Sequence, residues 1–123
     1  MKLRIRDNSL RLRLTRGEVD ALIREGKVLA HVRFSPEDRL LYALAQAPDA
    51  TRVSARFAQG ELLVVVPSPM ARSWAASEEV GMEAEQAIGA EGVLRILIEK
   101  DFACLKPREG EDDLDAFPHP KAK

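Results

Sequence analysis

Hydrophobic and charged residues alternate strictly at the start of the chain. Residues 2–6 (KLRIR) and 9–14 (SLRLRL) carry an aliphatic side chain at every second position, as in a strand that buries one face. Asp7 and Asn8 stand between the two stretches, and both residue types favour tight turns. The pattern therefore predicts a β-hairpin over residues 2–14.

A helix and a second hairpin are predicted next. Thr15 followed by Glu18 is the capping-box signature of a helix start, and Gly26 is placed to end that helix in the left-handed conformation. Two apolar-rich stretches then flank a Ser-Pro-Glu-Asp turn. These two predicted strands are residues 28–34 and 40–45. The first half of the chain is thus expected to have the order ββαββ.

The same order is predicted again after a break at Pro48 and Asp49. In this half, Ser68 is expected to be the N-cap of a helix and Pro69 its first residue. The strands expected around this helix are residues 52–57, 61–66, 80–86 and 93–98. The second half is therefore also predicted to be a ββαββ unit.

The two halves align without a gap at an offset of 52 residues, which places Leu12 on Val64 and Leu22 on Trp74. Inward positions coincide along the aligned elements, which indicates an internal duplication. The predicted fold class is α+β. We expect one domain over residues 1–99, made of repeats 1–48 and 51–99 with two short helices, and an irregular acidic tail over residues 100–123.

The second half resembles the swapped-hairpin units of the AbrB, MazE and SpoVT proteins. Residues 61–100 have the family's order of a strand ending in Val-Val-Pro, a short helix and a closing hairpin. The resemblance implies that two such units interlock in a β-barrel, here within one chain. Leu-Thr-Arg at 14–16 and Gly-Glu at 60–61 depart from the family pattern. The whole chain also resembles a family of small bacterial proteins of unknown function.

Length and composition favour a small globular protein. The chain has 123 residues, 46% hydrophobic and 32% charged, which suits a single domain. Apolar runs such as residues 62–67 are far shorter than the roughly 20 residues that span a membrane. Cys104 is the only cysteine, so no disulfide can form within the chain. We expect a cytoplasmic protein.

The charges are unevenly distributed and point to a candidate binding face. Residues 1–34 contain nine Lys/Arg and four Asp/Glu, although the net charge of the chain is −1. Period two places five cationic side chains on one face of the first hairpin, with a sixth at the helix start. The predicted anion-binding residues are Lys2, Arg4, Arg6, Arg11, Arg13 and Arg16. Their counter-charge could be nucleic acid, the chain's own acidic residues 109–115, or solvent ions.

A second candidate surface lies on the strand predicted at 61–66. If Leu62 and Val64 face the core, Leu63 and Val65 face outward, and exposed apolar strand residues favour association. Another protein, the tail or a second subunit could cover them; a central strand that is buried on both faces is the alternative.

Chemistry beyond binding has little support in the sequence. The chain contains no glycine-rich phosphate loop and no nucleophile elbow, and its histidines are His31 and His119. Cys104 and His119 are weak metal candidates, because single ligands without paired spacing rarely form a zinc site. No cofactor is predicted.

The leading hypothesis is a non-enzymatic binding module that engages an anionic partner, with duplex DNA as the candidate, through the basic hairpin. The alternative is a protein–protein adaptor or antitoxin-like module that uses the acidic tail and the apolar strand face.

Overall fold

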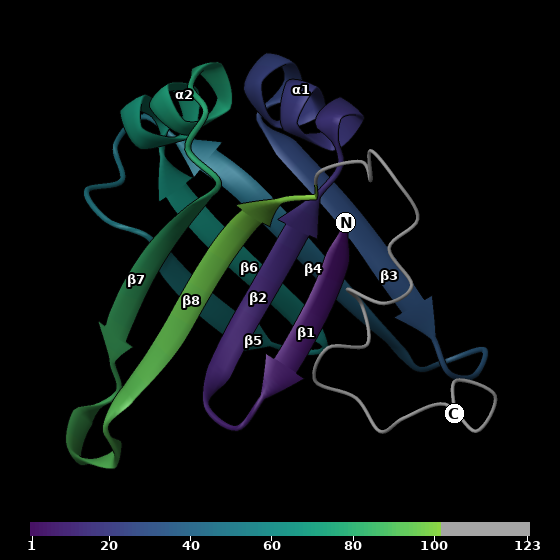
Figure 1. Cartoon of the computed structure of the whole chain (residues 1–123). Helices are drawn as coiled ribbons and strands as arrows, with labels where there is room; N and C mark the ends of the chain where they lie inside the picture. Colours follow the sequence, from purple (N-terminus) through teal and green to yellow (C-terminus); the bar gives the residue numbers. More distant parts are fainter. Residues whose placement is uncertain (102–123) are drawn as a thin grey trace, which may run out of the picture.

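Residues 1–101 are described by a computed structural model, in which eight strands and two α-helices follow one another in the predicted order (Figure 1). The strands are β1 (Lys2–Arg6), β2 (Ser9–Leu14), β3 (Lys27–Arg33), β4 (Arg39–Ala47), β5 (Ser54–Ala58), β6 (Glu61–Pro67), β7 (Gly81–Ala87) and β8 (Val93–Lys100). The helices are α1 (Arg16–Glu25) and α2 (Ser68–Ala76), and a 3-10 turn, η1 (Gly89–Glu91), joins β7 to β8.

The strands form two four-stranded sheets. Sheet A has the order β1-β2-β8-β7, and sheet B has the order β3-β4-β6-β5. Each sheet therefore combines the first hairpin of one half of the chain with the second hairpin of the other half. The central pairs, β2–β8 and β4–β6, are parallel, whereas each hairpin is antiparallel. Neither half of the chain contains a complete sheet of its own.

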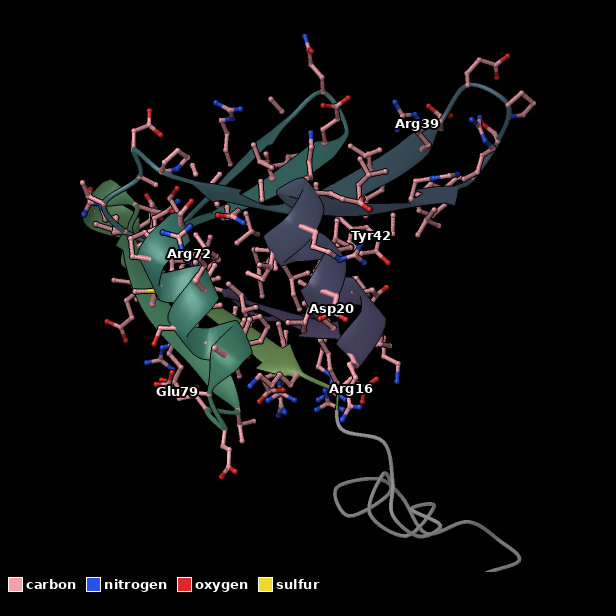
Figure 2. The ribbon with its side chains drawn as sticks, turned by 90° about the horizontal axis from the view of Figure 1, so that it is seen from above. Arg16, Asp20, Arg39, Tyr42, Arg72 and Glu79 are labelled. Carbon is pink, nitrogen blue, oxygen red and sulfur yellow. The ribbon has the colours of Figure 1, made fainter. Side chains whose placement is uncertain are left out.

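The two sheets enclose the core, and the two helices cover one end of it (Figures 1 and 2). Alternate residues of the central strands point inward because successive side chains of a strand face opposite sides. The largest fully buried side chains are Trp74, Leu12, Leu14, Leu22, Leu44, Ile96, Ile98, Val64 and Val66. Both halves thus contribute to a single core.

Trp74 of α2 fills the core at the helix-covered end and is completely buried. Its indole Nε1 donates a hydrogen bond to the Val80 carbonyl at 3.1 Å, so the polar atom of this buried ring has a partner. Lys100 Nζ lies 5.6 Å from the centre of the ring. Leu22, which the repeat aligns with Trp74, is likewise completely buried.

The predicted start of α1 is also confirmed. The amide of Glu18 donates to the Thr15 hydroxyl at 3.3 Å, and the amide of Thr15 donates to the Glu18 carboxylate at 2.9 Å. Gly26 ends the helix at φ 88°, in the left-handed region. The prediction for α2 is wrong by one residue: Pro67 is the N-cap, without a side-chain cap bond, and Ser68 is the first helical residue.

The expected closed barrel is not formed by residues 1–101, which make two separate sheets. Side chains, rather than strand pairing, join the sheets along the seam between β5 and β7. There the Gln86 amide donates to the Ala55 carbonyl at 2.9 Å and accepts from the Ala55 amide at 2.7 Å. A glutamine side chain takes the place that a neighbouring strand would occupy in a barrel.

The gap-free alignment of the halves is wrong after the helices. The first hairpins are related by 52 residues, because β1 begins at Lys2 and β5 at Ser54. The second hairpins are related by 54, since the cross-strand pair Val28–Leu44 corresponds to the pair Met82–Ile98. The connection between α2 and β7 is longer than the single glycine between α1 and β3. A two-residue shift leaves the inward and outward faces of a strand unchanged.

Candidate functional site

The first hairpin brings like charges together, as predicted. Its register places Lys2 opposite Arg13 and Arg4 opposite Arg11. Directly opposite positions of an antiparallel pair are about 5 Å apart at Cβ. Leu12 and Leu14 on the other face of β2 are buried, which holds the cationic side chains on the outer face. We call this surface, formed by Lys2, Arg4, Arg6, Arg11 and Arg13, the basic face.

A carboxylate from the far end of the chain lies beside the basic face. Because β2 pairs in parallel with β8, Glu99 is the strand neighbour of Arg13. Glu99 Oε1 is 3.3 Å from Arg13 Nη2 and 3.7 Å from Arg11 Nε, and the side chain of Glu99 is only 19% exposed. One carboxylate thus contacts two arginines.

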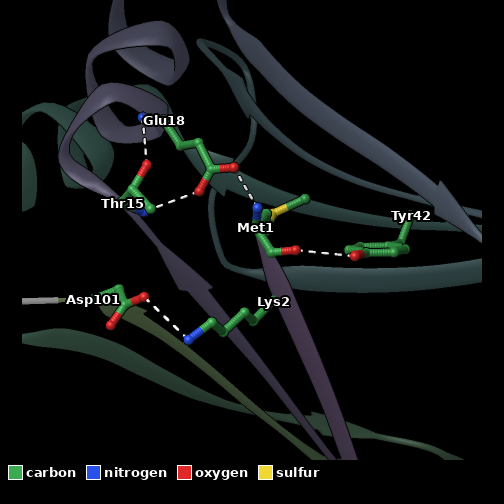
Figure 3. Close-up of polar contacts among 6 residues, drawn as sticks. All are labelled: Met1, Lys2, Thr15, Glu18, Tyr42 and Asp101. Carbon is green, nitrogen blue, oxygen red and sulfur yellow. Dashed lines mark hydrogen bonds and ion pairs between the residues drawn. The ribbon is translucent and has the colours of Figure 1, made fainter. Parts of the chain in front are cut away.

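Asp101 is a second carboxylate at this surface. Its Oδ2 lies 3.5 Å from Lys2 Nζ, and its amide donates to the Leu14 carbonyl at 2.7 Å. These contacts carry the chain from the end of β8 across the end of β2 to the start of β1 (Figure 3). The basic face contains five cationic side chains and contacts two carboxylates, so its net charge is +3 within residues 1–101.

Arg4 and Arg6 have no ion-pair partner among residues 1–101. Both are exposed on β1, which is the edge strand of sheet A. Arg16 is separate from these residues. It is the first residue of α1 and lies at the helix-covered end of the molecule (Figure 2).

The charge changes sign across sheet A. The register aligns Arg4, Arg11, Leu97 and Glu83 in one row over β1, β2, β8 and β7. Beside this row, Arg95 Nε lies 3.6 Å from the Glu85 carboxylate. A surface depression of about 630 Å³ covers the middle of the sheet. It is lined by Ser9, Leu10, Arg11, Glu83, Ala84, Glu85, Arg95 and Leu97.

Glu99, Asp101 and Arg95 were not predicted from the sequence to lie at this surface. Each lies more than 80 positions from the hairpin that it neighbours, and alternation within β8 shows only that Arg95 and Glu99 share a face. The pairing of β8 with β2 was the missing information. The resemblance to swapped-hairpin proteins contained that signal, because hairpin exchange implies such a pairing.

A polar cluster fixes the start of β1 (Figure 3). The Met1 ammonium pairs with Glu18 of α1, and the Tyr42 hydroxyl donates to the Met1 carbonyl at 2.9 Å. Burial acts to raise the pKa of Glu18. Hydrogen bonds from the Met1 ammonium and from Thr15, together with the positive charge of the ammonium, outweigh this effect, so the pKa of Glu18 lies below its ordinary value. The cluster ties β1 to α1 and to β4, which fixes the position of the basic face.

Leu63 and Val65 lie on the outer face of sheet B, as predicted, and both are half-buried. β6 is a central strand, so its neighbours shield part of each side chain. The register aligns Leu63 with Ala43 of β4, and Ala43 with Leu29 of β3. Leu29 is 53% exposed. An apolar row thus crosses three strands of this face.

The weak metal candidates Cys104 and His119 lie outside the described residues. Within residues 1–101, no group of three or more His, Cys, Asp and Glu side chains is placed to hold a metal ion. His31 is exposed on β3. None of the helices in this part of the chain is long and apolar enough to cross a membrane.

Residues 1–101 therefore define a small mixed α/β module with two helices, two four-stranded sheets and a cationic edge on one sheet. The chain belongs to the family of unknown function DUF7009, whose sequence profile matches residues 1–121. The comparisons with curated proteins and with solved structures give no match.

Proposed function

We propose that this protein is a non-enzymatic binding module whose basic face engages duplex DNA. The observation that carries the proposal is the direct opposition of Arg4 and Arg11 next to the pair Lys2–Arg13. Like charges at opposed positions destabilise a hairpin. An anion placed on this face removes that repulsion, so binding gains free energy that a neutral partner would not provide.

The internal carboxylates offset only part of this charge. Glu99 and Asp101 contact Arg11, Arg13 and Lys2, which leaves the net charge of +3 toward the exposed edge strand β1. Phosphates spaced along a nucleic acid can contact Arg4, Arg6 and Arg11 together and release condensed counterions. A polyanion suits the row of charges better than a single small anion does.

The position of the hairpin supports duplex DNA as the polyanion. β1 and β2 form one edge of sheet A, and the helices cover the end of the sandwich rather than this face. The major groove of B-DNA admits a two-stranded β-ribbon, and several DNA-binding proteins use strands in this way. A hairpin at a sheet edge is accessible for such docking.

The exchange of hairpins between the two halves supports a relationship to the swapped-hairpin proteins. In this proposal the two ββαββ units share an ancestor, a bacterial cytoplasm is the setting, and the two-sheet arrangement is an opened form of the expected barrel. The shared order of elements and the parallel pairs β2–β8 and β4–β6 are the supporting features.

The proposal is tested by fluorescence anisotropy with a labelled random-sequence duplex at about 50 and 200 mM salt. Binding that weakens steeply between the two salt concentrations is expected. Arg72 is an exposed arginine on α2, away from the basic face (Figure 2). The Arg72→Ala variant is therefore the control, and it should bind the duplex as the unmodified protein does. Absence of binding at the lower salt concentration contradicts the proposal.

A protein partner at sheet B is the second candidate function. The apolar row formed by Leu29, Ala43 and Leu63, with Val65 beside it, favours this adaptor or antitoxin-like role, because a partly exposed apolar strip suits a protein surface. Deletion of residues 107–123 separates the two functions. DNA binding through the basic face is retained or strengthened by the deletion, whereas binding of a protein that also recognises the acidic tail is lost.

A further inference from the structure

An apolar groove of about 260 Å³ opens between the two sheets, at the end opposite the helices. The cross-strand pair Ile5–Leu10 lines it from sheet A, and the pair Phe57–Leu62 lines it from sheet B. Ile5 is 62% exposed and Phe57 is 64% exposed. These are large apolar side chains on the inner faces of the sheets, where burial is the rule.

The chain beyond the described residues starts close to this groove. Asp101 is held beside Lys2, at the start of β1, and Ile5 lies three residues further along the same strand. That separation is about 10 Å at the rise of a strand. The sixteen residues that follow Asp101, up to Phe117, can span up to about 50 Å, so the chain is long enough for Phe117 to reach the groove.

Charge along this path is complementary. Arg4 and Arg6 flank Ile5 on β1, and their side chains are exposed. In the sequence, five acidic residues precede Phe117: Glu109, Glu111, Asp112, Asp113 and Asp115. Arg4 and Arg6 lie on the outer face of β1 and Ile5 on its inner face, and β1 is the edge strand of sheet A. An acidic run followed by a phenylalanine therefore suits a segment that crosses the outer face of β1 and turns around this edge into the groove.

The family match includes the tail. The DUF7009 profile extends to residue 121, so the residues after Asp101 belong to the sequence that defines the family. The acidic run and Phe117 of this chain lie within that matched segment.

We propose that residues 102–123 fold back along β1, with the acidic run on Arg4 and Arg6 and Phe117 in the apolar groove. The tail then acts as an internal competitor for the anion that the basic face binds. A free partner must displace the tail, so the tail lowers the apparent affinity of the basic face for that partner. The docking itself does not depend on DNA being the partner.

Disulfide cross-linking in the full-length chain tests the docking. Cys104 is first replaced by serine, and Ile5→Cys is combined with Phe117→Cys. The control pair combines Val80→Cys with Phe117→Cys, because Val80 is 51% exposed and precedes β7, at the opposite edge of sheet A. Mild oxidation at low protein concentration is followed by peptide mapping, which separates cross-links within one chain from those between chains.

The Ile5 pair is expected to cross-link within one chain at least about tenfold faster than the Val80 pair, since docking raises the effective concentration of the two thiols. Replacing Asp112, Asp113 and Asp115 by asparagine should reduce that advantage. Equal rates for the two pairs overturn the proposal. Disulfides formed mainly between chains also overturn it and identify a second copy as the occupant of the groove.

The cysteine pair and the deletion of residues 107–123 together distinguish docking of the tail from the proposed DNA binding. If deletion of residues 107–123 strengthens DNA binding, both proposals are supported. If the Ile5 pair cross-links selectively but neither full-length nor truncated protein binds DNA, the docking stands and DNA is the wrong partner.

Discussion

Removing the opposed pair Arg4 and Arg11 should flatten the salt dependence of DNA binding. The two arginines face each other across the hairpin, and the basic face has a net charge of +3 after Glu99 and Asp101 are counted. The double variant Arg4→Ala/Arg11→Ala reduces this to +1. Both side chains point away from the core, so the fold should be retained.

The magnitude follows from counterion release. With three phosphates neutralised, the slope of log affinity against log salt is about −2.7, which is an approximately 40-fold loss between 50 and 200 mM salt. With one phosphate neutralised, the slope is about −0.9 and the loss is about 3.5-fold. The difference is more than tenfold and well within the range of an anisotropy titration.

The control has the same change in total charge at other sites. Arg52 precedes β5 and Arg72 lies on α2, and both are exposed. The Arg52→Ala/Arg72→Ala variant should keep the slope of the unmodified protein. If both double variants flatten the slope equally, only the net charge of the protein matters. If neither does, the basic face does not contact phosphate.

Three further changes have expected outcomes. Glu99→Gln should steepen the salt slope to about −3.6, measured by the same titration; an unchanged slope would show that Glu99 does not screen the face. Trp74→Ala removes a completely buried side chain and should lower the free energy of unfolding by about 3–5 kcal/mol in a urea titration. The pKa of Glu18 lies below its ordinary value of 4.5, so its stabilising contribution is fully present above pH 4.5 and is lost as the pH falls through the folded-state pKa. Urea titrations across this range should therefore show the gap in stability between the unmodified protein and Glu18→Gln closing at low pH, and a gap that does not depend on pH would contradict the role of this carboxylate.

The order of elements was predictable from the sequence because alternation and capping are local signals. The Thr15–Glu18 capping box and Gly26 fixed the ends of α1. The register of the repeat was not predictable in the same way. Shifting β7 and β8 by two residues preserves every inward position, so the pattern alone could not distinguish an offset of 52 from one of 54.

The basic face was predictable as a row of charges, but its internal carboxylates were not. Glu99 reaches Arg11 and Arg13 only because β8 lies beside β2, and pairing between distant strands leaves no local signature. The absence of a closed barrel has a similar origin. Gln86 joins β5 to β7 through its side chain, and nothing in the sequence near Gln86 indicates that contact.

The exchange of hairpins also sets an order of events in folding. In sheet B the parallel partners Leu41 and Glu61 are 20 residues apart, whereas in sheet A the partners Ser9 and Arg95 are 86 apart. Closing the longer loop costs roughly 1.3 kcal/mol more entropy, and contacts of large sequence separation slow folding. Sheet B should therefore assemble first, and the β2–β8 ladder should form late. Pulsed hydrogen exchange during refolding would then protect β4 and β6 before β2 and β8, so that Glu99 and Asp101 reach the basic face only late in folding.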